Sequence, residues 1–583
     1  MTISSPSFKL SASPSSISHV IASFILALGW LLPNHYQPWV SFHSEAWVSI
    51  VLCVFAALPF LIYRELTDWH WLTLAIGALA IVPITQLWLG LIDFSGTALI
   101  GTIYLFGLAL SVQAGHRWQQ CRRDELGDIL FLSIGIAGTA SVGIQLHQWL
   151  GLVTQDSQLG LWMHQQIGSR PYGNLAQPNQ LSTLLTWGVL ASAWGFYRGF
   201  LRGSFAFLLA CFLVAGIALT QSRTGALAIL IISASTVYWR RSLPQRTFIA
   251  TLSLTIVYIA FAFSISPACE FLQLEQDENP TERLSAGIML RPAIWRMFID
   301  AVSVHPLSGY GMNQVLHAQA EKMLEHPEAF STAFGHSHNI FIDLLLWFGV
   351  PIGAIASVLL ILWFVTSVRA IKRPEDGVLA LFAIVIGVHS LLELPLHYAY
   401  FLLPTGMVIG MLNRENGRGI ILRSSRHAFL TALLVTSSLL ALSISDYFRI
   451  EAEMAELTLE KSWPGIQKGD KHPRNIFLLT QLREAIQLGR FAEHSEMSSE
   501  ELDWVRKATT NFPSPSNLYK LSSAYALNGR KQDAINWLRR TCGLVHPKIC
   551  EMAKNEWAEN QEKLPPSERI AWPAQTFENT FQR

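Results

Sequence analysis

Residues 204–220 read SFAFLLACFLVAGIALT, a run of 17 residues without a charged side chain. As an α-helix this run is about 25 Å long, most of the roughly 30 Å hydrocarbon core of a bilayer. Similar runs recur from Ile17 to Tyr447. Of the 583 residues, 51% are hydrophobic and 14% are charged, whereas about a quarter are charged in an ordinary soluble domain. The sequence therefore predicts a polytopic membrane protein.

The predicted fold class is all-α, with about thirteen membrane-spanning helices. We place them at 17–33, 46–63, 71–88, 95–113, 127–151, 179–197, 204–220, 224–238, 247–266, 351–370, 376–391, 399–413 and 427–446. Tryptophans near the ends of these runs, such as Trp30 and Trp149, are typical of the aromatic belts at membrane interfaces. We expect the first span to be retained, because no small-residue cleavage site follows a short apolar segment.

Positive charge is divided unequally between the predicted loops. With a cytoplasmic amino terminus, the inside loops hold sixteen Lys and Arg residues, and the opposite short loops hold only Arg170 and Arg223. This asymmetry predicts that the amino terminus is inside the cell. An odd number of spans then places the loop 267–350 and the tail 447–583 in the outer compartment.

The chain divides into a membrane domain, residues 1–446, and a soluble tail, residues 447–583. Helical periodicity marks 449–459 and 475–488 within the tail. Residues 517–538 predict a helix-turn-helix that resembles one tetratricopeptide unit. A helical module of this kind more often binds a protein than catalyses a reaction.

Cys542 and Cys550 lie eight residues apart in the predicted outer tail. Oxidation is permitted there, so a local disulfide is one interpretation and two free thiols are the other. The sequence has no cysteine and histidine spacing of a zinc site, no nucleotide-binding glycine loop and no basic nucleic-acid stripe. We therefore predict no metal, no cofactor and no nucleic-acid partner.

The segment Gly-His-Ser-His-Asn at 335–339 ends the predicted outer loop, whose bounds are 267–350. The apolar residues IFIDL follow directly at 340–344. Histidine accepts a proton near neutral pH, and a substrate carried by a lipid would meet it at the membrane surface. This location favours chemistry on a lipid-linked substrate.

Arginines on the predicted outer face are candidate anion ligands. Arg223 lies in a turn of a few residues between two spans, and Arg291 and Arg296 lie in the long loop. Arg223 either extends to the interface or holds a phosphate through paired N–H bonds. A loop arginine is usually only solvated, so Arg291 and Arg296 are each either solvated side chains or anion ligands.

Two further polar stretches lie at the outer ends of spans. Residues 171–180 read PYGNLAQPNQ, in which the amides either cap the next helix or donate to an anion or a sugar. Residues 389–398 read HSLLELPLHY. His389 alone is typical of packing, whereas Glu393 at membrane depth requires a partner.

These residues converge on a family. The stretch NLAQPNQL at 174–181 resembles the signature of bacterial protein O-glycosylation ligases, the PglL-type O-oligosaccharyltransferases, and 33–45 is similar to their first outer loop. Further segments resemble the broader fold shared with O-antigen ligases and polymerases: 221–225, Arg291 with Trp295, 306–311 and His338 with Asn339. The resemblance covers about residues 17–446.

The resemblance implies transfer of a preassembled glycan from undecaprenyl pyrophosphate to a serine or threonine of a periplasmic or pilin-like protein. It also implies a multi-pass protein of the bacterial inner membrane, with the active site and the tail in the periplasm. His338 would be the base, with His336 as second choice, and Arg223 and Arg291 would stabilise the leaving pyrophosphate. The predicted substrate-binding residues are Asn179, Gln180, His336, Asn339, Glu393 and Tyr398.

Two alternatives remain. The same glycan would go to lipid A core in an O-antigen ligase, or to another glycan in a polymerase; the soluble tail and the 174–181 motif argue against both. A transporter or flippase would show internal repeats and charges at mid-membrane depth. Here the polar clusters gather at one face, which favours an enzyme.

Overall fold

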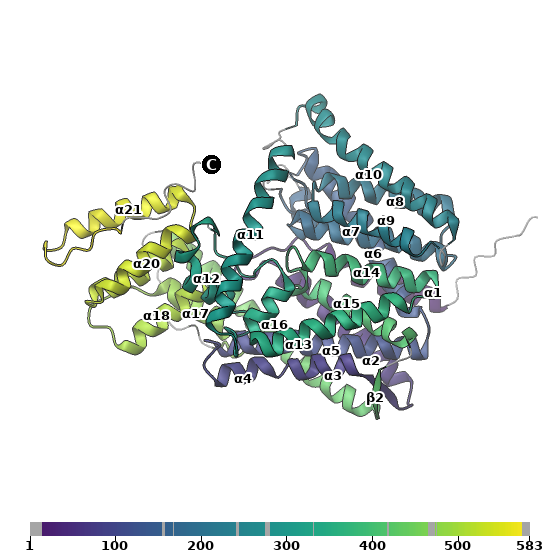
Figure 1. Ribbon diagram of the computed structural model, residues 1–583, viewed down its shortest axis with the longest axis horizontal. Coiled ribbons are helices and arrows are strands. Elements are labelled where there is room, and N and C mark those ends of the chain that lie inside the picture. Colours follow the sequence, from purple (N-terminus) through teal and green to yellow (C-terminus); the bar gives the residue numbers. More distant parts are fainter. Residues whose placement is uncertain are drawn as a thin grey trace, which may run out of the picture.

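The computed structural model describes residues 14–153, 158–166, 168, 170–240, 244–274, 280–329, 332–416, 419–463, 473 and 475–573. Helices make up almost all regular structure in this part of the chain (Figure 1). One two-stranded antiparallel sheet joins β1 (Thr67–His70) to β2 (Ile420–Ser424). The predicted all-α class is confirmed apart from this sheet, which pairs two predicted cytoplasmic loops.

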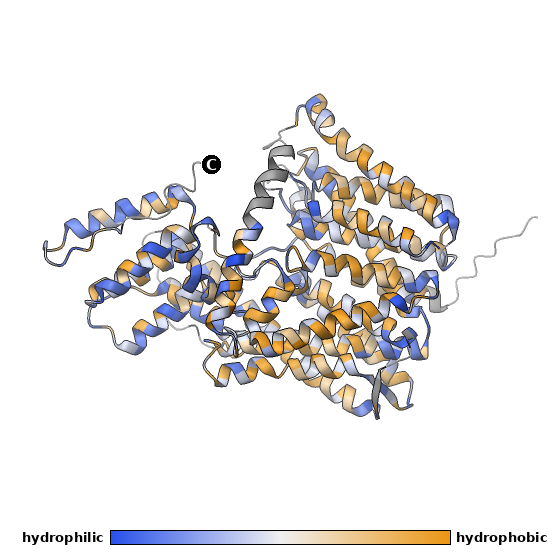
Figure 2. Cartoon of the chain, viewed as in Figure 1, coloured by the Kyte–Doolittle hydropathy of each residue, from blue (hydrophilic) through white to orange (hydrophobic). Residues whose placement is uncertain are grey.

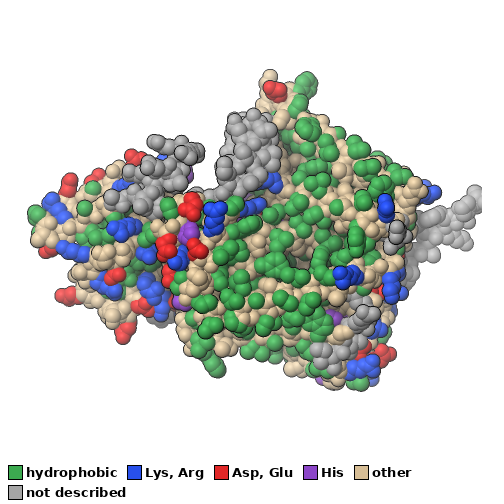
Figure 3. All heavy atoms as spheres, in the orientation of Figure 1, with side chains coloured by type: hydrophobic (Ala, Val, Ile, Leu, Met, Phe, Trp, Pro, Cys, Tyr) green, Lys and Arg blue, Asp and Glu red, His purple; other side chains and the backbone are tan. Residues whose placement is uncertain are grey.

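Seven segments of the described chain are long and apolar enough to cross a membrane. They are α2 (Phe42–Ile62), the pair α3 (Trp71–Leu79) and α4 (Val82–Trp88), α5 (Ser95–Cys121), α6 (Glu125–Trp149), α10 (Gln245–Leu272), α13 (Ile340–Arg369) and α16 (Arg426–Ser462). Figure 3 shows a broad apolar surface over the bundle. The chain is a multi-pass membrane protein, while the predicted count of about thirteen spans stays a prediction.

The other predicted spans correspond to helices outside this set of seven. They are α1 (Pro14–Ala27), α7 (Pro178–Tyr197), α8 (Gly203–Leu219), α9 (Arg223–Tyr238), α14 (Pro374–Ser390) and α15 (Ala399–Asn416). The predicted span 71–88 is broken between α3 and α4, and Pro83 lies in the first turn of α4. Proline fits a first turn because its missing N–H has no helical partner there.

Small residues let α5 and α15 pack closely. A Cβ on Gly115 would lie 2.0 Å from the Met407 carbonyl oxygen, and one on Gly410 would lie 2.0 Å from that of Val112. Glycine at such contacts allows helix backbones to approach inside a membrane. These two helices form the centre of one half of the bundle, and α7, with Trp187 and Trp194 buried, forms the centre of the other.

The predicted outer loop 267–350 is largely helical. It contains α11 (Pro280–Val304), α12 (Val315–Lys322) and the first part of α13. Gly349 interrupts α13 with a positive φ of 73°. Its α-carbon faces Leu307, whose carbonyl oxygen would lie 2.4 Å from an added Cβ. The kink therefore separates the residues after His338 from the span predicted at 351–370.

The tail forms a helical group beside the bundle (Figure 1), with polar and apolar residues interspersed (Figure 2). Its helices are α17 (Thr480–Arg490), α18 (Ser499–Asn511), α19 (Pro515–Leu527), α20 (Lys531–Leu544) and α21 (Pro547–Glu562). The helix-turn-helix predicted at 517–538 is present as α19 and α20; its relation to tetratricopeptide units stays a prediction. Helix α16 runs through the predicted domain boundary at 446.

A disulfide joins Cys542 and Cys550. It connects α20 to α21, which otherwise shares few contacts with it. Of the two interpretations of this pair, the local disulfide is the one that the structure contains.

Candidate functional site

The site begins at the amino end of α7. Pro178 occupies the first turn, and the Gln177 side chain caps the helix by accepting the Gln180 N–H at 3.2 Å. The same Gln177 amide donates to Glu393 Oε2 at 2.8 Å, and the Asn179 amide donates to Glu393 Oε1. The sequence predicts that the amides of this segment either cap the helix or donate to an anion or a sugar. In the structure they cap the helix and also donate to the Glu393 carboxylate.

Asn174, in the same segment, has a structural role. Its amide donates to the Leu31 and Trp162 carbonyls at 2.7 and 2.8 Å, and its oxygen accepts the His164 N–H at 2.9 Å. All its hydrogen-bonding atoms are therefore used within the protein. These hydrogen bonds hold the loop before α7 against the end of the first predicted span.

Glu393 follows α14 and lies at the meeting point of several groups. His389 Nε2 is 3.4 Å from Oε2, and Arg291 Nη2 is 3.9 Å from Oε1. Burial opposes ionisation of Glu393, but bonding to His389, Gln177 and Asn179 outweighs burial and lowers its pKa to about 2. The sequence-level expectation that this carboxylate needs partners agrees with these contacts.

The two arginines lie close enough to influence each other. Arg223 is the first residue of α9, capped by Ser222, whose hydroxyl also donates to Asn179 Oδ1 at 2.6 Å. Burial lowers the pKa of Arg291, Glu393 raises it, and the charge of Arg223 lowers it. Two guanidinium groups this close together offer paired N–H donors, which suit a pyrophosphate.

The histidine loop is held by the start of α13. The Ser337 N–H donates to Asp343 Oδ1 at 2.8 Å, and the Asn339 side chain caps the helix by accepting the Phe341 N–H at 3.0 Å. His338 lies between them with φ of 61°. A histidine in this left-handed region requires support from its surroundings, which these bonds provide.

Three imidazoles approach one another at this loop. The ring centroids of His336 and His338 are 4.3 Å apart, those of His336 and His397 are 6.1 Å apart, and His397 stacks on Trp347. Burial lowers the pKa of His336 to about 3 and that of His397 to about 4.

His338 is also held as a neutral imidazole near pH 7. Burial lowers its pKa, the Glu393 charge partly opposes this, and Arg291 lowers the pKa further. In the part of the chain that the structure describes, its Nδ1 is buried without a hydrogen-bond partner. A neutral imidazole with an unengaged nitrogen is suited to accept a proton.

The predicted site residues do not all have the same surroundings. His338, His336, Arg291, Arg223, Glu393 and Asn179 form one connected group. Gln180 lies beside this group and accepts the Tyr400 hydroxyl at 2.6 Å. Gln180 also bonds to Tyr398, and burial is the main cause that raises the pKa of Tyr398. Asn339 is the α13 cap. The catalytic and substrate-binding roles of all the predicted site residues stay predictions.

Sequence reasoning did not select Gln177 and His397 as site residues. Gln177 occupies the cap position before Pro178, and His397 lies four residues after Glu393. Both stood in stretches recognised as polar, but only the packing shows their partners. Among the described residues, no group of three or more His, Cys, Asp or Glu is placed to hold a metal ion.

Comparison with known proteins covers most of the chain. Residues 171–194 match a protein glycosylation ligase family, 205–356 an O-Antigen ligase family, and 378–548 the C-terminal region of a virulence factor membrane-bound polymerase family. A general O-oligosaccharyltransferase of Acinetobacter baylyi is 27% identical over 89% of this chain and 92% of its own length. A ComP-specific O-oligosaccharyltransferase of the same strain is 26% identical over 67% of this chain and 70% of its own length.

The chain resembles PglL-type O-oligosaccharyltransferases of the O-antigen ligase superfamily. The family resemblance predicted from the sequence is confirmed. Each of the three matched regions holds predicted site residues: the first holds Asn179, the second holds Arg223, Arg291 and His338, and the third holds Glu393.

Proposed function

We propose that this protein transfers a preassembled oligosaccharide from undecaprenyl pyrophosphate to a serine or threonine hydroxyl of a periplasmic protein, such as a pilin. The observation that carries the proposal is the juxtaposition of a neutral His338 with the Arg223 and Arg291 pair. A base for the acceptor and cations for the leaving group are the two requirements of this transfer.

The chemistry is a single displacement. The acceptor hydroxyl gives its proton to the neutral imidazole of His338, and its oxygen attacks the anomeric carbon. The bond from that carbon to the phosphate oxygen breaks, and the electron pair leaves on the lipid pyrophosphate. Attack opposite the leaving group inverts the anomeric configuration. Arg223 and Arg291 stabilise the growing negative charge.

Glu393 has a positioning role in this scheme. It accepts the amides of Gln177 and Asn179 and lies 3.9 Å from Arg291. These contacts orient the arginine, and the carboxylate charge keeps the His338 pKa from falling further. Gln180, Asn339 and Tyr398 are proposed to line the sugar-binding part of the site.

The proposal includes an orientation. The protein lies in the inner membrane, with the histidine loop, Glu393 and the tail in the periplasm. The arginine and lysine asymmetry between loops supports this arrangement.

A second candidate has a sugar hydroxyl as acceptor, as in an O-antigen ligase or polymerase. The matches over 205–356 and 378–548 favour it, because their families carry those descriptions. The base and the arginine pair would serve either acceptor, so acceptor identity separates the two.

The deciding experiment is reconstitution. The purified protein in proteoliposomes receives undecaprenyl-pyrophosphate oligosaccharide and either a pilin-like protein or lipid A core, and mass spectrometry detects the glycan mass on each. We expect modification of the protein. Modification of the lipid A core alone would favour the second candidate, and glycoproteomics of cells with and without the chain provides the cellular comparison.

A further inference from the structure

A large groove lies among α7, α8, α9, α10 and α14, which are stacked in one half of the bundle (Figure 1). Its cavity volume is about 500 Å³. Apolar residues from all five helices line it, among them Val189, Ala210, Ile232, Leu254 and Leu381. Helix α10 forms its outermost wall and carries exposed Ile249 and Leu252, so the groove is next to the hydrocarbon of the membrane.

Most hydroxyl groups of this groove are engaged within the protein, and Ser253 and Arg246 are its other polar lining residues. Ser192 donates to the Val189 carbonyl at 2.7 Å, Thr236 to that of Ile232 at 2.8 Å and Thr251 to that of Thr247 at 2.9 Å. Ser233 pairs with Thr255 at 2.7 Å. A serine or threonine whose hydroxyl is so used presents mainly its carbon atoms. The wall is therefore suited to a hydrocarbon chain rather than to a sugar or an ion.

Three of the groove helices carry the candidate site at their other ends. Arg223 begins α9, Asn179 lies in the first turn of α7, and Glu393 follows α14. Ile229, the lining residue of α9 nearest the site, is about 9 Å along the helix from Arg223 at 1.5 Å per residue. Trp239, which lines the far end, is about 24 Å away by the same measure. A hydrocarbon chain that followed α9 from the site would therefore reach the lining residues of this helix.

We propose that this groove holds the hydrocarbon tail of the lipid-linked donor while its pyrophosphate lies between Arg223 and Arg291. The inference rests on the proposed function and adds the location of the tail. Because the groove starts about 9 Å from Arg223, only a donor with a long tail fills it.

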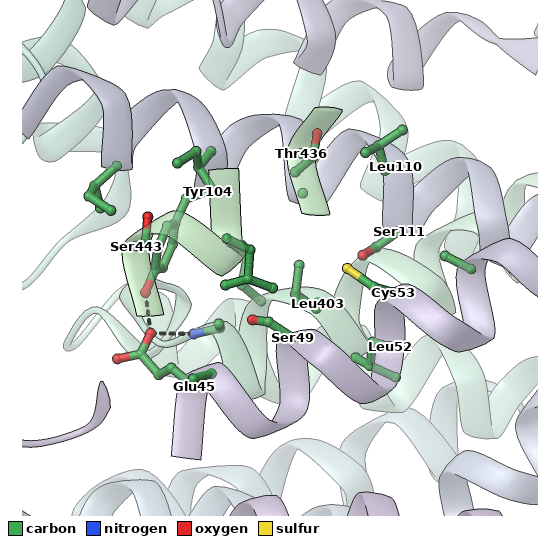
Figure 4. A pocket seen from close by; sticks show the side chains of 18 of the residues that line it. Glu45, Ser49, Leu52, Cys53, Tyr104, Leu110, Ser111, Leu403, Thr436 and Ser443 are labelled. Atoms are coloured by element: carbon green, nitrogen blue, oxygen red, sulfur yellow. Dashed lines mark hydrogen bonds between the residues drawn. The ribbon is translucent and has the colours of Figure 1, made fainter. Parts of the chain in front are cut away.

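A second groove in the bundle is distinguished by its charge. It lies among α2, α5, α15 and α16, has a cavity volume of about 80 Å³ and is lined by Ser49, Cys53, Leu403 and Thr436 (Figure 4). The buried carboxylate of Glu45 lies at one end, bonded to the Tyr104 hydroxyl and to the Ala399 N–H at 2.9 Å. A buried carboxylate at that end disfavours a pyrophosphate head there. This groove is therefore the matched control.

The test compares two donors that share one glycan, a full-length undecaprenyl donor and a donor with a tail of two isoprene units. Ala250 lines the first groove on its outermost wall, and Ser49 lines the control groove. In the reconstituted protein, we expect Ala250→Phe to raise the KM of the full-length donor about tenfold through lost apolar burial. The kcat and the KM of the short donor should stay unchanged, and Ser49→Phe should have neither effect.

An equal change with both donors, or a change caused by Ser49→Phe instead, would overturn the inference. A donor with a photoreactive group in its tail gives a second measurement on the unaltered protein. Labelling of α9 or α10 peptides supports the groove, whereas labelling of α2 or α16 contradicts it. If the unaltered protein transfers glycan from neither donor, the proposed function itself fails, and this result differs from transfer without tail-length dependence.

Discussion

Arg291 Nη2 lies 3.9 Å from Glu393 Oε1, although the two residues belong to segments far apart in the chain. This ion pair connects α11 to the turn after α14, next to the amides of Gln177 and Asn179. It partly neutralises an arginine that burial would otherwise disfavour. Under the proposed function, a bound pyrophosphate would take over part of that role.

Glu393→Gln should shift the pH dependence of transfer to lower pH. The His338 pKa is below its ordinary value of 6.5, and Glu393 raises it while burial and Arg291 lower it. A base acts when neutral, so the rate is lost as pH falls through this pKa. Removing the Glu393 charge lowers the pKa further. Initial rates normalised to their plateau measure the acid limb, and a shift to higher pH would contradict the assignment of His338.

His338→Ala should lower the transfer rate by about 10²–10⁴-fold, the usual contribution of a general base. The protein should still insert, accumulate and bind the donor. His305→Ala is the control, because this half-exposed histidine lies in the same outer segment at the end of α11. Wild-type modification by the His338 variant would give the histidine a structural role.

Arg223→Ala and Arg291→Ala should abolish transfer and weaken donor binding. Lysine at either position should leave transfer strongly impaired, because it keeps the charge and loses the planar fork. Equilibrium binding of a labelled donor in nanodiscs measures the effect. Intact binding and transfer in both alanine variants would place the pyrophosphate elsewhere.

The charge asymmetry of the loops predicts the orientation of the chain. A phosphatase reporter fused after Arg583 should be active, and one fused after Arg246 should be inactive. Enzyme activity in whole cells, with fusion protein level as control, is the measurement. The reverse pattern would move the proposed site to the cytoplasm.

Exchanging residues 447–583 for the tail of a related ligase should change which proteins are glycosylated and leave donor choice unaltered. The junction falls inside α16, and Arg490 of α17 pairs with Glu453 and Glu460 of that helix at 2.7 and 2.9 Å. An exchange of 447–583 moves both partners of each pair together, because all three residues lie in this segment. Glycoproteomics measures the acceptor range.

The tail also contacts the outer loop, which makes expression an essential control. Arg540 donates to the carbonyl of Ala320 in this loop at 2.7 Å, and Asn511 donates to Asp93, in the short loop before α5, at 2.8 Å. An unchanged acceptor range after a well-expressed exchange would assign acceptor selection to the outer loop, 267–338.

Local sequence determined the helices and several of their ends. Apolar runs such as 204–220 form membrane helices because backbone polar groups inside a bilayer have to be satisfied within the segment. Pro178 is the first residue of α7. Asn339 caps α13 by accepting the N–H of Phe341, which is only two residues further along the chain. The motif around His338 was recognisable for the same reason, since its residues are contiguous.

Contacts between distant segments were decided by the tertiary structure alone. The sequence required a partner for Glu393, but the packing of α7, α11 and α14 decided that Gln177, Asn179 and Arg291 are its partners. The groove beneath Arg223 and the sheet of β1 and β2 likewise depend on which helices and loops adjoin. Apolar patterning marks a side chain for burial, whereas the shape complementarity of whole helices selects its neighbours.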